Sequence, residues 1–197
     1  ALTVRTGTSI TQQPSSQSAC PGATVQLTAT GAGDGAVAYQ WRKNGNNLNN
    51  GGHYAGVTTS TLTVSNMDRN DAASYQCIVT AGCGSVTSND VSLVLKNVTS
   101  IVQQPANQSV AGGGNAQFTV AAAGSGVLSY QWQRNGVNLA DGGNIAGAGT
   151  ATLAVSGVGR ADYGLYRCLV AADCGIATSN TAVLTVHADT NGDLHVD

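Results

Sequence analysis

Asp71-Ala-Ala-Ser-Tyr-Gln-Cys77 and Asp162-Tyr-Gly-Leu-Tyr-Arg-Cys168 are the two stretches of sequence that decide the fold. They lie 91 residues apart, and the sequence around them repeats at the same offset without a gap, so that Tyr39-Gln-Trp41 returns as Tyr130-Gln-Trp132. A fixed period in a chain of 197 residues indicates one folding unit used at least twice. Because a unit of 91 residues can bury a core of its own, we expect two domains in tandem.

The local patterns predict strands rather than helices. Apolar and polar residues alternate with a period of two in short runs, as expected of strands that are buried on one face. In the first repeat these runs are residues 25–29, 38–41, 61–65, 75–79 and 91–95. Turn signals separate them, and Asn44-Gly45, which returns as Asn135-Gly136, predicts a two-residue hairpin turn with positive φ at both central positions. Short strands at this spacing predict an all-β fold of two tandem β-sandwiches.

Three motifs in combination resemble the immunoglobulin superfamily, and its intermediate set most closely. They are Tyr-Gln-Trp followed by Asn-Gly, then Thr-Leu-x-Val-Ser, then Asp-x-Gly-x-Tyr-x-Cys. The stretch from Gly142 to Leu153 is similar to immunoglobulin-like repeats of large secreted bacterial proteins of the planctomycete type. The resemblance implies immunoglobulin-like domains in residues 8–96 and 97–187, with core tryptophans, tyrosine corners and aspartates that brace the turn before the following strand. These residues are Trp41 and Trp132, Tyr75 and Tyr166, and Asp71 and Asp162.

Residues 1–7 match the end of a repeat. Ala1-Leu-Thr-Val4 aligns with the final strand of both repeats, and Arg5 aligns with Lys96. We therefore expect the tail strand of a preceding repeat, or a linker, in residues 1–7. The alternative is that this segment is the first strand of the first domain.

Five cysteines among few charges favour an oxidising compartment, although the odd number leaves at least one without a partner in this chain. The immunoglobulin family normally joins two core strands through a disulfide beside the tryptophan. Cys77 and Cys168 match one end of that bridge, but Ala29 and Val120 stand at the other. The resemblance therefore implies that the family bridge is absent.

Other pairings of the cysteines stay open. Bridges from Cys77 to Cys83 and from Cys168 to Cys174 would each span a tight hairpin, and they are out of reach if the strand runs past the first cysteine. A bridge from Cys20 to Cys83 would join opposite ends of one sandwich. We favour a bond between Cys20 and Cys174 that links the two domains, because in a tandem array the turn that holds Cys20 is expected to face the turn of the next domain that holds Cys174. This bond would also explain why Ala111 replaces Cys20 in the second repeat. Free thiols are the remaining alternative, with Cys77 and Cys168 buried and inert beside the tryptophans.

The tail, residues 188–197, resembles the start of a dockerin-like calcium loop of EF-hand type. Its candidate ligands alternate along the chain, as a loop that supplies oxygen to Ca²⁺ requires. They are Asp189, Asn191, Asp193, His195 and Asp197. Leu194 stands where such a loop usually has Gly, and the printed sequence stops before the closing acidic ligand. A polar tail with chance Asp spacing is the alternative, so Ca²⁺ at the tail is the one cofactor that we consider.

Charge and composition argue against several functions. Only 9% of residues are charged and the formal net charge is −2, so no basic stripe is available for nucleic acid. The apolar runs in the sequence are too short for a membrane span. No arrangement of acid, base and nucleophile recurs, so we expect no enzyme. We expect His53 to be a solvated loop side chain, and we consider Tyr54 beside it as a small sugar-stacking platform or an ordinary half-buried residue.

The function expected from these observations is extension and adhesion outside the cell. We interpret the chain as a stiff spacer array in a secreted or cell-surface bacterial protein, with neighbouring immunoglobulin-like repeats of the same polypeptide as its partners. One alternative is an adhesin module that binds a surface glycan or a protein. A second alternative is a homopolymer in which residues 1–4 are donated as a strand to another subunit.

Overall fold

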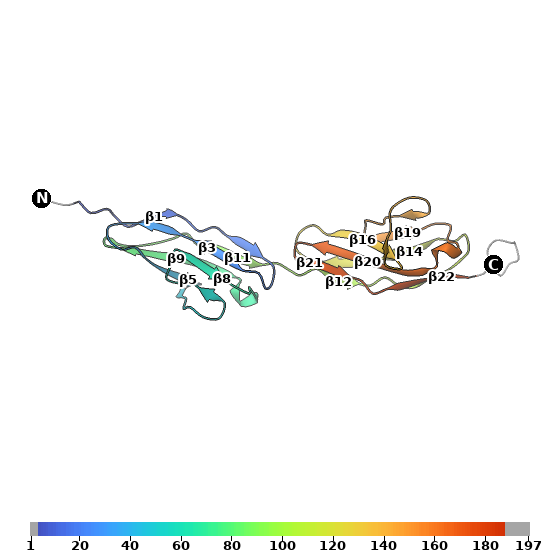
Figure 1. Ribbon diagram of the computed structural model, residues 1–197, viewed down its shortest axis with the longest axis horizontal. Helices are drawn as coiled ribbons and strands as arrows, with labels where there is room; N and C mark the ends of the chain where they lie inside the picture. The colour runs from blue at the N-terminus through green and yellow to red at the C-terminus, as the bar shows by residue number, and fades with distance from the viewer. Residues whose placement is uncertain (1–3, 188–197) are drawn as a thin grey trace. The chain divides into compact units, whose positions relative to one another are not determined.

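A computed structural model describes residues 4–187, which divide into two units between Lys96 and Asn97. Each unit is one continuous stretch of chain: in Figure 1 the colour runs from blue to green through the first unit and from yellow-green to red through the second. Both units are built from strands, with a single 3-10 turn described in each. The prediction of an all-β fold of two tandem sandwiches is confirmed.

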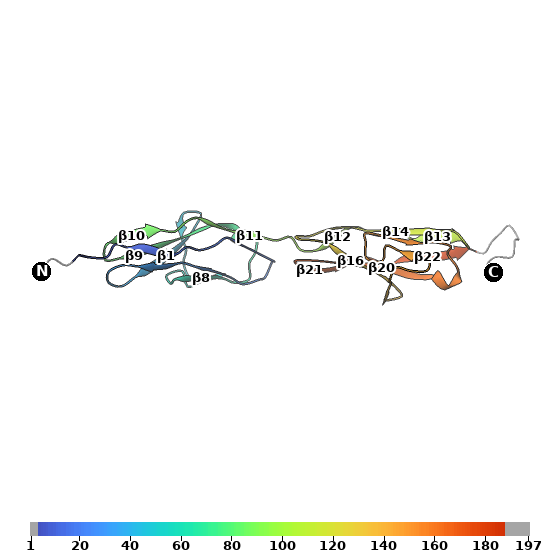
Figure 2. The same ribbon diagram turned by 90° about the horizontal axis from the view of Figure 1, so that it is seen from above.

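The first unit has two main sheets. One has the strand order β2-β11-β9-β5-β6, with β10 also paired to β9; the other has the order β3-β8-β7, and β1 pairs with β4. Figure 2 shows β9 and β10 side by side. The elements are β1 (Ser9–Gln12), β2 (Gln17–Ala19), β3 (Val25–Thr28), β4 (Thr30–Ala32), β5 (Ala38–Lys43), β6 (Asn46–Asn47), β7 (Tyr54–Ala55), β8 (Thr61–Val64), η1 (Arg69–Asp71), β9 (Ala73–Ala81), β10 (Gly84–Thr87) and β11 (Val91–Leu95).

The second unit repeats this topology. Its larger sheet has the order β13-β22-β20-β16-β17 with β21 paired to β20, its smaller sheet has the order β14-β19-β18, and β12 pairs with β15. The elements are β12 (Ser100–Gln103), β13 (Gln108–Ala111), β14 (Ala116–Thr119), β15 (Ala121–Ala123), β16 (Ser129–Arg134), β17 (Val137–Asn138), β18 (Ile145–Ala146), β19 (Thr152–Val155), η2 (Arg160–Asp162), β20 (Gly164–Ala172), β21 (Gly175–Thr178) and β22 (Ala182–His187). In both units the strand after the buried proline, β2 or β13, pairs in parallel with the last strand, β11 or β22.

Each unit closes a core of its own between its sheets. Trp41 and Trp132 are fully buried, and their indole N–H groups donate to the carbonyls of Thr59 at 3.0 Å and Thr150 at 2.9 Å. A buried indole needs such a partner, because an unpaired N–H group inside a core is costly. The alternation seen in the sequence puts the apolar residues of β3, β8 and β9 inward, as their burial patterns show.

The predicted hairpin at Asn44-Gly45 is confirmed. Lys43 pairs with Asn46, so the loop has two residues, and both have positive φ, 48° for Asn44 and 79° for Gly45. Asn135 and Gly136 repeat these values with 50° and 83°. This backbone geometry gives the turn a twist that matches the twist of the two strands it joins.

The cysteines exclude both hairpin bridges. Cys77 and Cys168 are buried free thiols and Cys83 is an exposed free thiol, so neither Cys77–Cys83 nor Cys168–Cys174 is formed. The physical reason is that β9 continues past Cys77 to Ala81, which leaves Cys83 in the turn beyond it. Burial raises the pKa of both Cys77 and Cys168 to about 11, which keeps these thiols protonated. Cys20 and Cys174 are disulfide-bonded.

Two predictions fall on residues outside the range 4–187. The calcium-loop ligands in residues 189–197 therefore stay predictions, as does the part of the predicted 1–7 segment that covers residues 1–3. Residues 4–7 of that segment are described and form no strand. Within the described range, no helix is both long and apolar enough to span a membrane.

Candidate functional site

The candidate site lies at the turn η1, immediately before β9. Asp68 ends the preceding segment in an extended conformation, and its carboxylate accepts the backbone N–H of Asn70 at 2.7 Å. Asp71 closes the turn from the other side, because its Oδ2 accepts the backbone N–H of Asp68 at 3.0 Å. This reciprocal capping satisfies N–H groups that a short turn leaves without partners. Tyr75 fixes the turn to β9 by donating its hydroxyl to the Asp71 carbonyl at 2.9 Å.

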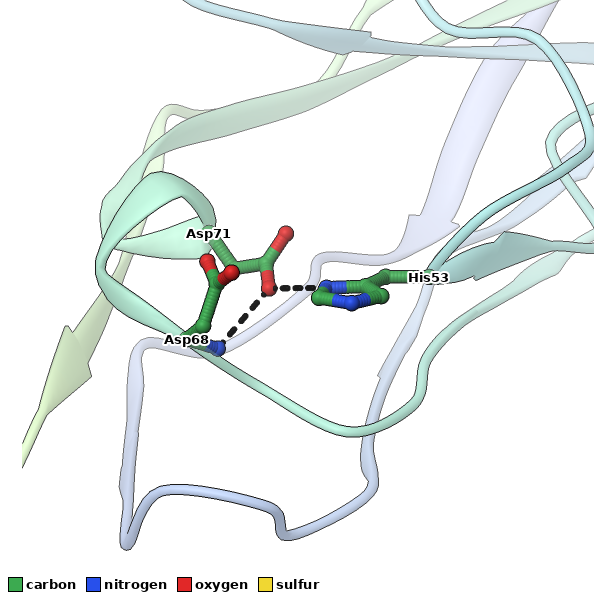
Figure 3. A group of neighbouring side chains, drawn as sticks. All are labelled: His53, Asp68 and Asp71. Atoms are coloured by element: carbon green, nitrogen blue, oxygen red, sulfur yellow. Dashed lines mark hydrogen bonds and ion pairs between the residues drawn. The ribbon is translucent and has the colours of Figure 1, made fainter.

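Three groups converge on the carboxylate of Asp71, which is 1% exposed. Nδ1 of His53 lies 2.7 Å from Oδ2, and the hydroxyl of Tyr54 donates to Oδ1 at 2.5 Å. Figure 3 shows the His53 ring reaching the Asp71 carboxylate from a facing segment, while Asp68 lies beside Asp71 on the same turn. Two segments far apart in sequence thus supply one polar cluster, which we call the His53 cluster: His53, Tyr54, Asp68 and Asp71.

The electrostatics of the His53 cluster favour a charged carboxylate. Burial alone would raise the pKa of Asp71, but the hydrogen bonds from Tyr54, the Asp68 backbone and His53 outweigh it and lower that pKa below its ordinary value. Burial and the bond to Asp71 raise the pKa of Tyr54 far above its ordinary range, so Tyr54 stays a donor. Lys43 contacts Tyr54 rather than Asp71: its ammonium donates to the Tyr54 hydroxyl at 2.8 Å and to the Asn70 carbonyl.

The second unit offers the same scaffold with different side chains. The carboxylate of Asp162 accepts the backbone N–H of Gly159 at 3.0 Å, and its backbone carbonyl accepts the hydroxyl of Tyr166 at 2.7 Å. Its carboxylate accepts Arg134 at 3.1 Å and the side-chain amide of Asn144 at 2.9 Å. Arg134 here satisfies the buried aspartate directly. The first unit instead uses an imidazole and a phenol for that purpose.

One expectation about this region is wrong. His53 is not a solvated loop side chain, because its ring is half-buried and paired with Asp71. Of the two alternatives for Tyr54, the ordinary half-buried residue is confirmed, and its hydroxyl is used inside the cluster. The repeat itself carried a signal for the first contact: Asn144, the counterpart of His53, also has a side-chain N–H to give to the aspartate.

The His53 cluster is the candidate metal centre of the described residues. His53, Asp68 and Asp71 each offer one ligand atom, and these three atoms lie within 4.8 Å of one another. Imidazole nitrogen with carboxylate oxygen is a donor set typical of Zn²⁺ and related transition metals.

A second feature is the outer face of the larger sheet in the second unit. Leu165 and Ile176 are 47% and 68% exposed there. A hollow of about 400 Å³ opens on this face between β16, β17, β20 and β21. It is lined by Ser129, Tyr130, Gln131, Gln133, Asn138, Leu169, Ala171 and Ile176. Ser74, Thr80 and Ser85 stand at the positions that Leu165, Ala171 and Ile176 occupy in the second repeat, so the equivalent face of the first unit is more polar.

Comparisons with known proteins agree with the topology. The immunoglobulin domain family matches residues 9–80 and 99–171. Peroxidasin homolog of Mus musculus is 26% identical over 190 residues, which cover 94% of this chain and 13% of that protein. Hemicentin-1 of Homo sapiens is 28% identical over 182 residues, which cover 89% of this chain and 3% of that protein. Roundabout homolog 3 of Homo sapiens is 26% identical over 192 residues, with 90% and 14% covered. The chain therefore spans a small part of each of these relatives.

Solved structures show the same fold. An I-band fragment of titin superposes with a TM-score of 0.78 at 18% identity, covering 95% of this chain and 67% of that one. Extracellular domains 3–5 of Drosophila OTK give a TM-score of 0.59 at 19% identity, with 91% and 62% covered. The motifs, the two strand topologies and the match over both repeats lead to one conclusion: this chain belongs to the immunoglobulin domain family.

Proposed function

We propose that this chain is a non-catalytic structural and adhesion segment of a secreted or cell-surface protein, in which tandem immunoglobulin domains act as a stiff spacer. The observation that carries the proposal is that each repeat closes a complete sandwich core, while one cysteine in each repeat, Cys20 or Cys174, is disulfide-bonded. Segments of hemicentin-1 and roundabout homolog 3 are similar to this chain in sequence, and the OTK domains that share its fold are extracellular. A disulfide suits the same oxidising surroundings.

A bond between Cys20 and Cys174 is part of this proposal. Within the first unit, Cys20 follows Ala19, whose carbonyl accepts the N–H of Lys96 at 2.8 Å, so Cys20 lies where the chain leaves that unit. Within the second unit, Cys174 lies in the turn before Gly175, whose carbonyl accepts the Thr99 hydroxyl at 2.8 Å. Cys174 thus lies where the chain enters its unit. Each cysteine thus lies at the end of its own domain to which the linking segment, residues 96–99, is attached.

Peptide mapping without reduction tests the pairing. We expect one cross-linked pair of peptides that contain Cys20 and Cys174 and that separate on reduction. A peptide linking Cys168 to Cys174, or alkylation of Cys20 before reduction, would overturn the pairing.

The spacer role is tested with C20S/C174S against C83S as the matched control. The distribution of distances between spin labels on the two domains should broaden in the double variant and stay unchanged in the control.

Protein binding is the second candidate function, and the outer face of the β16–β20–β21 sheet favours it. Exposed Ile176 lines the hollow together with Leu169, Gln131 and Gln133, and exposed Leu165 lies on the same face beside Arg167. Surfaces of this composition are typical of protein contacts rather than of sugar sites, which need exposed aromatic rings. The matching face of the first unit provides the internal comparison.

Paired protein and glycan arrays distinguish the two functions. The variant L165S/A171T/I176S gives the second repeat the residues of the first. A protein that binds the parent chain but not this variant supports the adhesion role. Proteins that bind both chains equally, or an array without any binding protein, argue against adhesion by this face and favour the spacer role. A glycan hit that the variant keeps argues against recognition by this face.

Three finer features are also proposed. We infer that the chain comes from an array of repeats in a secreted bacterial protein, because the stretch from Gly142 to Leu153 resembles the repeats of such proteins. Calcium binding by residues 189–197 and strand donation by residues 1–4 rest on sequence alone. Calorimetry with Ca²⁺ on a chain extended past Asp197, and sedimentation of this chain over a range of concentrations, test them. The absence of heat with Ca²⁺, or a monomer at every concentration, would remove the respective proposal.

A further inference from the structure

We propose that His53, Asp68 and Asp71 form a zinc-binding site at the turn η1 of the first domain. The three ligand atoms already lie within 4.8 Å of one another. Their close approach comes from a turn whose geometry is fixed by capping bonds and from a facing segment whose histidine points at it (Figure 3). The site is independent of the proposed spacer role.

The donor set selects a transition metal over calcium. Ca²⁺ takes oxygen ligands, six to eight of them, whereas one imidazole with two carboxylates suits the four-coordinate geometry of Zn²⁺ with a water as the fourth ligand. Ligands of a tetrahedral zinc lie about 2.0–2.2 Å from the metal and therefore a little more than 3 Å from one another. Nδ1 of His53 and Oδ2 of Asp71 lie 2.7 Å apart. A small outward movement of the imidazole would thus let zinc replace the hydrogen that the two atoms share.

Burial and hydrogen bonding prepare the ligands for such a metal. Asp71 forms the enclosed wall of the site, while His53, with a side chain 29% exposed, and half-buried Asp68 form the side that solvent reaches. The Tyr54 hydroxyl holds the other oxygen of Asp71, as partners behind a metal ligand commonly do. The Asn70 backbone N–H holds one oxygen of Asp68 at 2.7 Å, which orients its carboxylate.

The second domain shows that the ligands are an addition to the fold, not a requirement of it. At the offset of 91 residues, Asn144 replaces His53 and Gly159 replaces Asp68, whereas Asp162 retains the aspartate. The second domain still forms the turn and still satisfies its aspartate, with Arg134 and Asn144. Of the three proposed ligands, His53 and Asp68 are therefore specific to the first domain, where they occur together.

Isothermal titration with ZnCl₂ tests the proposal on the full chain carrying C83S, which removes the exposed thiol as a competing ligand. The matched variant adds H53N and D68G, the residues that the second repeat tolerates at these positions. We expect the variant to lose one zinc per chain, or to bind it at least about tenfold more weakly, since even a change behind a metal ligand costs about 10- to 100-fold. The remaining histidines and the carboxylates of residues 188–197 contribute equally to both chains.

A gain-of-site variant removes doubt about folding. N144H/G159D gives the second domain the ligands of the first, and Gly159 accepts a side chain because its backbone is extended and its Cβ would meet open space. We expect one additional zinc per chain. Equal zinc stoichiometry and affinity in the C83S parent and in H53N/D68G would overturn the proposal. If H53N/D68G fails to fold, nitrogen NMR of the His53 ring in the C83S parent decides, because a ring signal unchanged by zinc excludes the site.

Discussion

At the scale of single residues, the chemistry of the first domain centres on the carboxylate of Asp71. It is buried, it accepts three hydrogen bonds through its side chain, and its backbone carbonyl holds Tyr75. An asparagine there keeps the shape but has only one accepting oxygen, so its amide N–H₂ would face a donor.

D71N should therefore lower the free energy of unfolding of the first domain by about 3 kcal/mol, the order expected when buried donors lose a charged partner. Urea unfolding followed through Trp41 measures it, with W132F in the background so that one tryptophan reports. The matched control, D162N in the same W132F background, should leave the Trp41 transition of the first domain unchanged. A loss below about 1 kcal/mol for D71N would show that the carboxylate is not needed.

The same carboxylate predicts a dependence on acid. Because the pKa of Asp71 is lower in the folded chain than in the unfolded one, its stabilisation is complete above the unfolded pKa near about 3.9 and is lost as the pH falls through the lower folded value. The stability difference between the parent chain and D71N should narrow below about pH 4. Urea midpoints of the first domain between pH 2 and pH 6 measure this. A difference that stays constant over that range would contradict the assigned shift.

The free thiols predict a simple count. Cys83 is exposed, whereas Cys77 and Cys168 are buried with pKa values of about 11, so a thiol reagent at pH 8 should modify one thiol in the native chain. After unfolding without a reductant it should modify three. Absorbance with Ellman's reagent measures both values. Bridges across the two hairpins would give one thiol after unfolding, which is the outcome that contradicts this assignment.

At the scale of elements, the turn before β8 in the first repeat and the equivalent turn before β19 in the second each depend on one glycine. Gly56 has φ of 75°, and a Cβ there would lie 2.3 Å from the Thr61 carbonyl oxygen. Gly147 repeats this with 79° and 2.2 Å from Thr152. The close approach of two backbone segments leaves no space for a side chain, so the position needs glycine for its contact as well as for its φ.

G56A should cost clearly more stability than G45A. Both glycines have φ near 75–79°, but the Cβ of an alanine at Gly45 would meet nothing within 4 Å. We expect about 1 kcal/mol for G45A from the left-handed backbone alone, and about 3 kcal/mol for G56A, in which the turn must also move. Urea unfolding of the two variants compares them directly. Equal losses would show that the Thr61 contact can relax without cost.

The strands and the Asn44-Gly45 hairpin could be predicted because their signals are local. Alternation within a few residues and a two-residue turn with positive φ need no knowledge of distant neighbours. The contact between His53 and Asp71 could not be predicted in that way, because 18 residues separate them and only the closed sandwich brings them together. The pairing of the cysteines was difficult to predict for a similar reason, because it depends on where the strands end. Cys77 is excluded from the hairpin bridge by how far β9 extends, which the sequence suggested without deciding.

At the scale of the whole molecule, the two cores are separate clusters of residues, one within each unit. Under reducing conditions the chain should unfold as two domains whose stabilities change independently.

G56A and G147A, alone and together, test this independence. Each should shift the unfolding transition of its own domain, and the two free-energy losses should add within about 0.5 kcal/mol in the double variant. Fluorescence of Trp41 and of Trp132 in W132F and W41F backgrounds follows the domains separately. A single transition that either substitution shifts for both tryptophans would contradict independent domains.

The parallel pairing of β2 with β11, and of β13 with β22, has a mechanical consequence. When the two ends of a domain are pulled apart, parallel strands slide along each other, so every hydrogen bond between them bears the force at once instead of opening one after another. The register joins three residue pairs in the first domain, Gln17 to Ala19 with Leu93 to Leu95, and four in the second, Gln108 to Ala111 with Leu184 to His187. Under tension the first domain should therefore rupture before the second.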